Sequence, residues 1–313
     1  MKAVQVEEPG VENLQVAESA DPVPGPGEVL IATEAATINP ADAAVVNGTV
    51  AARLPWAASP PYTPGWDLVG RIVGVGPCVR PSVVGTRVIG FSLWFESVRG
   101  TQSSLVTLPV GNVVEVPDNF PASHLTTVGL NGLTAWRGLA DLKLEPGETL
   151  IITGAAGSVG GFAVELAVAR GFTVVGVVRG HDKQEVFDLG AAAEVSAEND
   201  ELGAAVREIV PGGADALLDT ASIAAPALAA IRDGGKYVTV TELPSPERGI
   251  DVFRSGGRMD AQALATLVEM ASSSRLHTPV AKTFDVDDAR RAYQAFASRP
   301  GRGRIVLTFP EAS

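Results

Sequence analysis

Cysteine is nearly absent from this sequence of 313 residues, which contains only Cys78. A single thiol excludes a framework of disulfide bonds and any zinc site built from several cysteines. Long apolar runs are missing too: the nearest one, 214–231, is interrupted by Asp215 and Asp219, whereas a transmembrane helix needs roughly 18–20 apolar residues. The N-terminal residues show no basic stretch leading into an apolar run, so we expect no secretory signal. These absences predict a cytoplasmic protein without a membrane partner.

Basic residues are also few. The chain has 24 Lys and Arg against 36 Asp and Glu, a formal charge of −12, and no cluster of Lys or Arg is longer than two residues. Proteins that bind the phosphate backbone of nucleic acids present a basic face. The composition therefore argues against a nucleic-acid partner, while a hydrophobic content of 46% excludes wholesale disorder.

The two parts of the chain follow different patterns. Up to about residue 120, short runs rich in Val and Ile are bounded by Gly and Pro, which predicts a compact β unit. From about residue 148, strands alternate with helices, which predicts a doubly wound parallel sheet. A strand at 304–309 then returns to the first part. The predicted strands of the second part are 149–155, 173–178, 214–221 and 236–241, and the predicted helices are 158–171, 183–191, 225–235, 260–273 and 286–298.

Three glycines with a spacing of three follow the strand at 149–155. Side chains at Gly154, Gly157 and Gly160 would block a tight turn, the approach of a pyrophosphate to the backbone, or the packing of helix on strand. The start of the following helix adds N–H groups that favour phosphate. The alternative is a plain helix-capping turn. The pattern predicts a dinucleotide site formed by Gly154, Ala155, Ala156, Gly157, Ser158, Val159 and Gly160.

The next strand, 173–178, ends in Arg179, and Lys183 begins the helix after it. Sites for NAD usually carry Asp or Glu about 20 residues after the glycines, where the carboxylate binds the ribose 2′-OH. Two cations suit a 2′-phosphate instead. Asp182 stands between them and weakens the pattern, and the alternative is a solvated charge cluster. We expect NADP as the cofactor.

Seven segments have an order and spacing that resemble one family: zinc-free medium-chain dehydrogenases/reductases of the NADPH:quinone oxidoreductase type. The resemblance implies a GroES-like, β-rich catalytic domain over 1–122 and 273–313 and a Rossmann NADP-binding domain over 123–272, an α/β protein. Family members are commonly homodimers that pair through the edge of the Rossmann sheet. The segments are INPAD (38–42), GWDLVGRIVGVG (65–76), VGTRVIGF (84–91), NGLTAW (131–136), GAAGSVGG (154–161), DLGA (188–191) and GRIVLTF (303–309).

Zinc-dependent relatives of this family need a catalytic Cys, a Gly-His-Glu motif and a later Cys or Asp ligand. The Gly-His-Glu position reads Gly65-Trp66-Asp67 here, and residues 39–42 stand where the Cys falls. The three histidines and Cys78 show no ligand spacing. We therefore predict no metal.

The resemblance places Asn39 and Asp42 beside the nicotinamide ribose and the substrate, and Thr134 near the nicotinamide and phosphates. An Asn amide can donate to a carbonyl oxygen, whereas Asp42 suits fixing the loop better than proton transfer. The alternative for both is a structural turn with an Asx-type bond. Ala44 replaces a Tyr that many relatives carry, which puts Tyr-assisted protonation in doubt.

Aromatic residues make up only 5% of the chain, and several gather in two loops of the first part. Flat conjugated ligands gain from stacking and burial on such surfaces. We expect a substrate cleft here, with Tyr62 the only nearby Tyr able to act as an acid, and the alternative is a local core or a subunit contact. The residues are Trp56, Tyr62, Phe91, Trp94 and Phe95.

The sequence thus predicts an oxidoreductase that transfers hydride from NADPH to a quinone or to an α,β-unsaturated carbonyl. Asn39 or a cofactor hydroxyl would hold the resulting oxyanion, and the proton would come from solvent. One alternative is an enoyl-thioester or polyketide-type enone reductase, with Arg53 and Arg99 as candidates to bind a phosphopantetheine. The other is a non-catalytic NADPH-binding sensor, which Ala44 keeps open.

Overall fold

The computed structural model describes residues 1–50, 59–198, 201–298 and 303–310. The chain folds as two compact units, which we call the first unit (Met1–Leu130 with Met259–Ser313) and the second unit (Asn131–Arg258). Residues 123–130 and 259–272, expected in the nucleotide-binding part, belong to the first unit. Among the described helices, none combines the length and the apolar character that crossing a bilayer requires.

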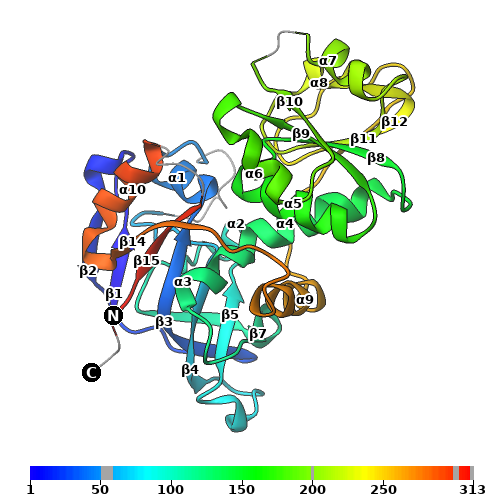
Figure 1. Cartoon of the computed structure of the whole chain (residues 1–313). Helices are drawn as coiled ribbons and strands as arrows, with labels where there is room; N and C mark the ends of the chain where they lie inside the picture. Colours follow the sequence, from blue (N-terminus) through cyan, green and yellow to red (C-terminus); the bar gives the residue numbers. More distant parts are fainter. Residues whose placement is uncertain (51–58, 199–200, 299–302, 311–313) are drawn as a thin grey trace. The chain divides into compact units, whose positions relative to one another are not determined.

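A seven-stranded sheet lies at the centre of the first unit (Figure 1). The last strand pairs antiparallel with β3, in a register that sets Val306 opposite Thr37, so the chain end returns to this unit as expected. The sheet has the order β14 (Val280–Asp285), β15 (Arg304–Thr308), β3 (Glu28–Ile38), β4 (Asp67–Val75), β5 (Arg87–Phe91) and β7 (Val113–Glu115), and β6 (Leu105–Pro109) also pairs with β3.

The remaining elements of the first unit surround this sheet. A two-stranded antiparallel sheet is formed by β1 (Lys2–Gln5) and β2 (Gln15–Glu18). The two helices predicted near the end of the chain are confirmed as α9 and α10. The helices are α1 (Pro40–Val46), α2 (Trp94–Ser97), α3 (Ala122–Leu125), α9 (Ala261–Ser272) and α10 (Ala289–Ala297).

Alternation along β3 explains one core of the first unit. Val29 and Ile31 are fully buried, and Leu30 between them and Ala32 after them are half-buried, as a strand with one face on a core requires. They pack against Leu68, Ile72 and Val106 from β4 and β6. Burial of such side chains contributes roughly 1.5–3 kcal/mol each and stabilises the packing of these strands.

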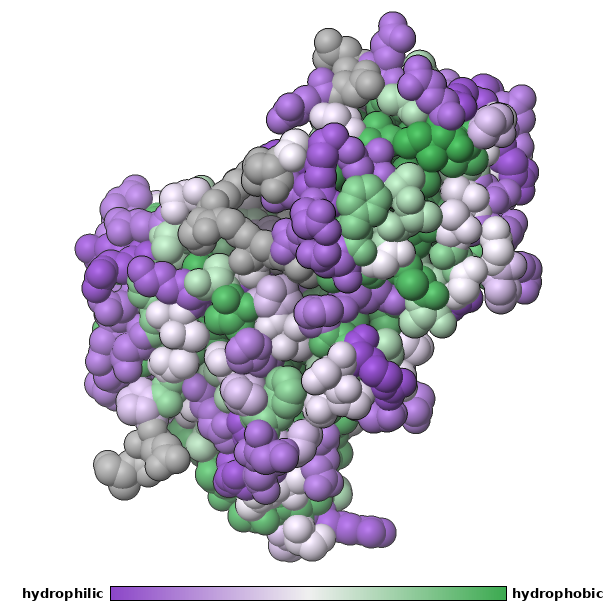
Figure 2. Space-filling model, in the orientation of Figure 1, coloured by the Kyte–Doolittle hydropathy of each residue, from purple (hydrophilic) through white to green (hydrophobic). Residues whose placement is uncertain are grey.

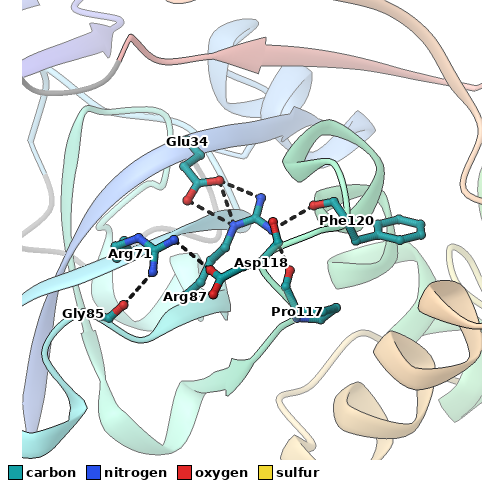
Figure 3. A network of polar contacts seen from close by, with 7 residues as sticks. All are labelled: Glu34, Arg71, Gly85, Arg87, Pro117, Asp118 and Phe120. Atoms are coloured by element: carbon teal, nitrogen blue, oxygen red, sulfur yellow. Dashed lines mark hydrogen bonds and ion pairs between the residues drawn. The ribbon is translucent and has the colours of Figure 1, made fainter.

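Arg87 on β5 ties three segments of the first unit together (Figure 3). Its guanidinium donates to both carboxylate oxygens of Glu34 on β3, at 2.7 Å for the closest contact, and to the carbonyl oxygens of Pro117 and Phe120 at 2.7 and 2.8 Å. The planar Arg side chain has five N–H donors, so it can satisfy a carboxylate and two carbonyls at once. The contacts fix the chain just before α3.

The second unit contains the predicted doubly wound sheet, with six parallel strands (Figure 1). Its inner strands are apolar and buried, as expected of a sheet with both faces covered. The order is β10 (Ala193–Ser196), β9 (Thr173–Val178), β8 (Thr149–Thr153), β11 (Ala214–Asp219), β12 (Ile231–Thr239) and β13 (Asp251–Arg254). The helices are α4 (Gly129–Leu142), which starts in the first unit, α5 (Ser158–Ala169), α6 (Lys183–Asp188), α7 (Leu202–Ile209) and α8 (Ala225–Leu228).

The prediction of a helix over 225–235 was wrong for the second half of that range. Helix α8 ends at Leu228, and β12 begins at Ile231, which pairs with Ala214 of β11 and is fully buried. The hydrogen bonds of the sheet and the burial of Ile231 therefore override a local pattern that resembles a helix. The edge strand β13 was not predicted, because its four residues are mostly exposed and show no apolar pattern.

The surface is mixed in character. In the view of Figure 2, hydrophobic residues reach the surface of both units but are interspersed with hydrophilic ones. This agrees with an acidic chain that carries charges of both signs.

Candidate functional site

The glycine loop lies where the strand order of the second unit reverses. From β8 the chain proceeds to β9 and β10 on one side, and from β11 to β12 and β13 on the other. Ligands of open parallel sheets bind outside the carboxyl ends of the strands at such a reversal. The predicted cofactor residues 154–160 connect the carboxyl end of β8 to the first turn of α5.

The geometry of the loop requires two of its glycines. Gly154 has a φ of +61°, in the left-handed region that favours glycine. A Cβ on Gly160 would lie 2.1 Å from the carbonyl oxygen of Gly154. The loop therefore lies against the start of α5 and offers backbone instead of side chains. The first N–H groups of this helix of 12 residues have no intrahelical acceptors. Such a cradle fits the pyrophosphate of a dinucleotide.

Arg179 and Lys183 have different surroundings. Arg179 follows the last residue of β9 and is exposed, and its side chain has no partner among the residues that the structure describes. Lys183 is the first residue of α6, and its Nζ pairs with Oε1 of Glu194 on β10 at 2.5 Å. This ion pair offsets the Lys183 charge, so Arg179 is the stronger candidate for a 2′-phosphate.

Thr134 lies on α4, in the second unit, and only 7% of it is exposed. A buried Thr on a helix serves packing and local hydrogen bonding in most settings. Its predicted contact with the cofactor stays a prediction.

Asn39 and Asp42 form a reciprocal capping box at the start of α1. The N–H of Asn39 donates to Oδ2 of Asp42 at 2.6 Å, and the Asn39 side chain accepts the N–H of Asp42 in return. Pro40 occupies the first helical position, which its fixed φ suits. Both polar side chains are fully buried. The contacts that they make are structural, as in the turn alternative, and their catalytic role stays a prediction.

Sequence reasoning missed Asp67 as a functional candidate. This fully buried residue begins β4, and its Oδ2 accepts the N–H of Leu130, near the start of α4, at 2.8 Å. Its Oδ1 accepts from Nδ2 of Asn39 at 3.3 Å. A Cβ on Gly129 would lie 2.5 Å from the Cβ of Asp67, so the contact depends on that glycine. The one signal in the sequence was a carboxylate at the start of an otherwise mostly apolar strand.

Asp42, Asp67 and Arg304, which we call the Asp67 cluster, share one buried environment. Burial raises the pKa of Asp67 to about 6, although the Leu130 N–H and the Arg304 charge oppose it. Burial, with the charge of Asp67, raises the pKa of Asp42 well above its ordinary value. Burial lowers the pKa of Arg304 to about 10 against the attraction of both carboxylates. Within the described part of the chain, Oδ1 of Asp42 and Nε of Arg304 have no hydrogen-bond partner.

Two of the residues predicted to line an aromatic cleft are interior residues. Phe91 and Trp94 are 1% and 0% exposed. The Trp94 ring lies 5.3 Å from that of Trp66, and its Nε1 donates to the carbonyl oxygen of Thr63 at 2.8 Å. Because the indole N–H already has a partner inside the unit, Trp94 belongs to a local core, which corrects the expectation for these two residues.

Tyr62 and Phe95 lie at the edge of the same aromatic core and are half-buried. Their ring centroids are 6.2 and 5.7 Å from that of Trp94. The backbone of Tyr62 is paired with that of Val6. The place of these two residues beside a substrate stays a prediction, and Trp56 lies outside the described residues.

The described residues at the expected ligand positions of the first unit do not fit a zinc ion. Among the residues described, no group of three His, Cys, Asp or Glu is arranged to hold a metal. At the position of the Gly-His-Glu motif, Trp66 packs on Trp94, and the Asp67 oxygens accept from Leu130 and Asn39. A catalytic zinc generally takes three protein ligands. That donor set is missing from the described part of the unit.

Two family models match the chain. The model for the alcohol dehydrogenase GroES-like domain matches residues 25–118, and the model for zinc-binding dehydrogenase matches residues 189–307. The first match lies within the first unit, and the second runs from the second unit into the returning strand of the first. Together they span both units.

Curated relatives of the chain have several activities. The alcohol dehydrogenase of Moraxella sp. (strain TAE123) is 26% identical, with 99% of each chain covered. The quinone oxidoreductase of Lama guanicoe is 32% identical over 62% of this chain and 58% of that protein. The spectinabilin polyketide synthase system protein NorB of Streptomyces orinoci is 27% identical over 94% of this chain, which spans only 14% of that protein.

The fold matches solved structures over nearly its whole length. The quinone oxidoreductase from Coxiella burnetii has a TM-score of 0.88 and 21% identity, with 98% of this chain and 99% of that chain covered. At this identity the match shows the fold alone. It confirms the expected combination of a GroES-like domain with a Rossmann-type parallel sheet.

Proposed function

Because this chain belongs to the medium-chain dehydrogenase/reductase superfamily, oxidoreductases that bind nicotinamide dinucleotides, we propose that it reduces a quinone or an α,β-unsaturated carbonyl with NADPH. The observation that carries the proposal is the glycine loop at 154–160, held against α5 at the strand reversal. The identity with a quinone oxidoreductase supports the class of acceptor. A cytoplasmic location and a small-molecule partner belong to the same proposal.

The protein's part in this reaction is binding and positioning. When bound, the nicotinamide supplies the hydride. The backbone at the start of α5 binds the pyrophosphate, and Arg179 pairs with the 2′-phosphate. The Asn39 amide is the proposed donor to the substrate oxygen, and Asp42 holds the Asn39 backbone in place. The proton comes from solvent.

The reaction is tested by following the loss of nicotinamide absorbance with NADPH and with NADH. The acceptors are an ortho-quinone, a para-quinone, an alkyl enone and an aldehyde. We expect consumption with a quinone or the enone and a clear preference for NADPH. Consumption with the aldehyde alone would contradict the proposal. Tight NADPH binding without consumption of any acceptor would favour the sensor alternative.

The choice of NADPH is tested by replacing both Arg179 and Lys183 with Ala. Since a hydrogen bond to a charged group contributes roughly 1.5–3 kcal/mol, we expect a loss of about 2–4 kcal/mol in NADPH binding and little change for NADH. Because Lys183 is paired with Glu194, Arg179→Ala alone should cause most of the loss. An equal loss for NADH would show that these side chains do not bind the 2′-phosphate.

An enoyl-thioester substrate is a second candidate, favoured by the match to a polyketide synthase over 94% of this chain. Of the cations predicted to bind a phosphopantetheine, Arg99 is paired with Glu28 at 2.8 Å, and Arg53 lies outside the described residues. We would compare one enoyl group as its coenzyme A thioester and as a short thioester. A strong preference for the coenzyme A form would favour this candidate over the free enone.

We propose a homodimer that pairs through β13. This strand is the edge of the parallel sheet, so one row of its N–H and C=O groups lacks a neighbouring strand within the unit. Phe253 on it is 45% exposed. Light scattering coupled to gel filtration should give a dimer for the native chain and a monomer for Phe253→Glu. A native monomer would contradict the assembly.

A further inference from the structure

A second loop lies beside the glycine loop at the strand reversal. Strands β8 and β11 are neighbours, and Thr153 at the end of β8 lies in register with Asp219 at the end of β11. The loop at 220–224, which follows β11, contacts the glycine loop directly. The Thr220 Oγ1 donates to the carbonyl oxygen of Thr153 at 2.6 Å, and a Cβ on Gly154 would lie 3.2 Å from the Cβ of Ala221.

This 220–224 loop has an unfavourable backbone. Ser222 and Ala224 have φ values of +61° and +57°, in the region that residues with a side chain rarely adopt. Each such residue costs on the order of 1–2 kcal/mol and persists only where its surroundings hold it. Strain of this kind concentrates at ligand sites.

The Asp219 carboxylate holds the loop. Its Oδ1 accepts from Thr153 Oγ1 at 2.6 Å and from the Ala221 N–H at 3.1 Å. Its Oδ2 accepts from the Ala224 N–H at 2.9 Å and from the Tyr237 hydroxyl at 2.6 Å. Asp219 is fully buried. Burial acts to raise its pKa, but the hydrogen bonds outweigh burial and bring the pKa below its ordinary value, so the group stays an anion.

We propose that Asp219 is a positioning residue of the dinucleotide site, fixing the 220–224 loop as the wall that faces the nicotinamide half of the cofactor. The inference rests on the proposed function, because it assumes that a dinucleotide binds at the glycine loop. In a doubly wound sheet the two halves of a dinucleotide lie on opposite sides of the reversal. Arg179, at the end of β9, marks the adenosine side, so the loop after β11 belongs to the other half.

The test uses two probes on the full chain, NADPH and its adenosine-side fragment 2′,5′-ADP, with Kd from isothermal titration calorimetry. We expect Asp219→Asn to raise the Kd of NADPH at least tenfold and to leave that of 2′,5′-ADP within twofold. Equal weakening of both probes, or no change in NADPH binding, would overturn the proposal. If the native chain binds neither probe, the proposed function itself fails, which is a different result.

Asp215→Asn is the matched control. Asp215 lies at the other end of β11 and likewise accepts from backbone and side chain, here one N–H, that of Thr149, and one guanidinium, that of Arg232. We expect both Kd values to stay unchanged in this variant, and a tenfold loss of NADPH binding in it would overturn the proposal.

A second variant keeps the proposal testable if Asp219→Asn does not fold. Ala224→Gly relieves the positive φ, so it should fold, but it frees the loop that Asp219 holds. We expect it to raise the Kd of NADPH about threefold with no change for 2′,5′-ADP. Unchanged NADPH binding in this variant would overturn the proposal.

Discussion

The two units bury acidic side chains in contrasting ways. In the second unit, Asp219 receives hydrogen bonds from four donors, two side-chain hydroxyls and two backbone N–H groups. In the first unit, Asp67 receives the Leu130 N–H and one long bond from Asn39, and a second carboxyl, Asp42, stands beside it. Neither Asp219 nor Asp67 is exposed to solvent.

The pKa values of the two carboxyls shift in opposite directions. Hydrogen bonds outweigh burial at Asp219 and lower its pKa, whereas burial prevails at Asp67 and raises its pKa to about 6. More donors converge on Asp219, and the cost of burial is larger at Asp67, so both differences favour an ionised Asp219 and a raised pKa at Asp67. The carboxyl end of β11 provides such donors because the 220–224 loop turns back over it. The start of β4 lies beside the first residues of α4 and the residue that caps α1, and each donates a hydrogen bond to Asp67.

The largest expected effect is that of Asp219→Ala, which removes the acceptor of four hydrogen bonds, two of them buried. We expect a loss of about 3–5 kcal/mol in the free energy of unfolding, as for a broken buried charge network. Urea denaturation measures it. Asp215→Ala, on the same strand but half-buried, should lose only about 1 kcal/mol. Equal losses in the two variants would show that the Asp219 contacts stabilise the fold no more than those of Asp215.

Arg304→Met tests the other side of the comparison. At pH 7.5 Asp67 is ionised, so removal of the buried cation should cost about 3 kcal/mol. At pH 5, below the pKa of about 6, Asp67 is mostly protonated, and the cost should largely disappear. Arg71→Met, which breaks the exposed pair with Asp118, should change stability by less than about 1 kcal/mol at either pH. A cost independent of pH for Arg304→Met would contradict the raised pKa values.

The stability of the native protein should depend on pH through the ionisation of Asp67. Its pKa is about 6 in the folded chain against 3.8 unfolded, so the folded state holds the proton more tightly. The contribution of Asp67 is therefore most favourable at low pH and falls as the pH rises through about 6. Between pH 5 and 7.5 we expect the free energy of unfolding to drop by about 1 kcal/mol.

Asp67→Asn cannot titrate, so this drop should vanish from its denaturation curves. Asp215 has a lowered pKa and does not titrate in that range, so the Asp215→Asn variant should keep the drop. A slope that survives in Asp67→Asn would assign it to another group.

The smallest effect is expected from Tyr237→Phe, which takes one of the four donors from Asp219. We expect a loss of about 1 kcal/mol and a pKa for Asp219 that moves up towards its ordinary value. A carbon-13 NMR titration of the Asp carboxyls measures the shift. If the pKa of Asp219 does not move, donor number does not explain the difference between the two units.

Much of the fold was predictable because its signals are local. The alternation of apolar strands and helices predicts the parallel sheet, and α9, α10 and the returning β15 lie where their patterns place them. Gly154 and Gly160 are required by a φ value and by a contact within one turn of chain, so their spacing alone indicates the loop. What failed, such as the helix expected after Leu228, failed where sheet pairing overrode a local preference.

The sequence by itself determined the two-part architecture and the dinucleotide loop, because periodicity, turn residues and glycine spacing act over a few residues. Only the tertiary structure decided the state of the charges. The Asp67 cluster joins residues 42, 67 and 304, and Lys183 meets Glu194 across two elements. Trp94 is buried in a core where its Nε1 donates to the carbonyl oxygen of Thr63, 31 residues earlier in the chain. Burial and electrostatic interactions depend on which groups from distant parts of the chain come into contact. A pattern of a few neighbouring residues does not contain this information.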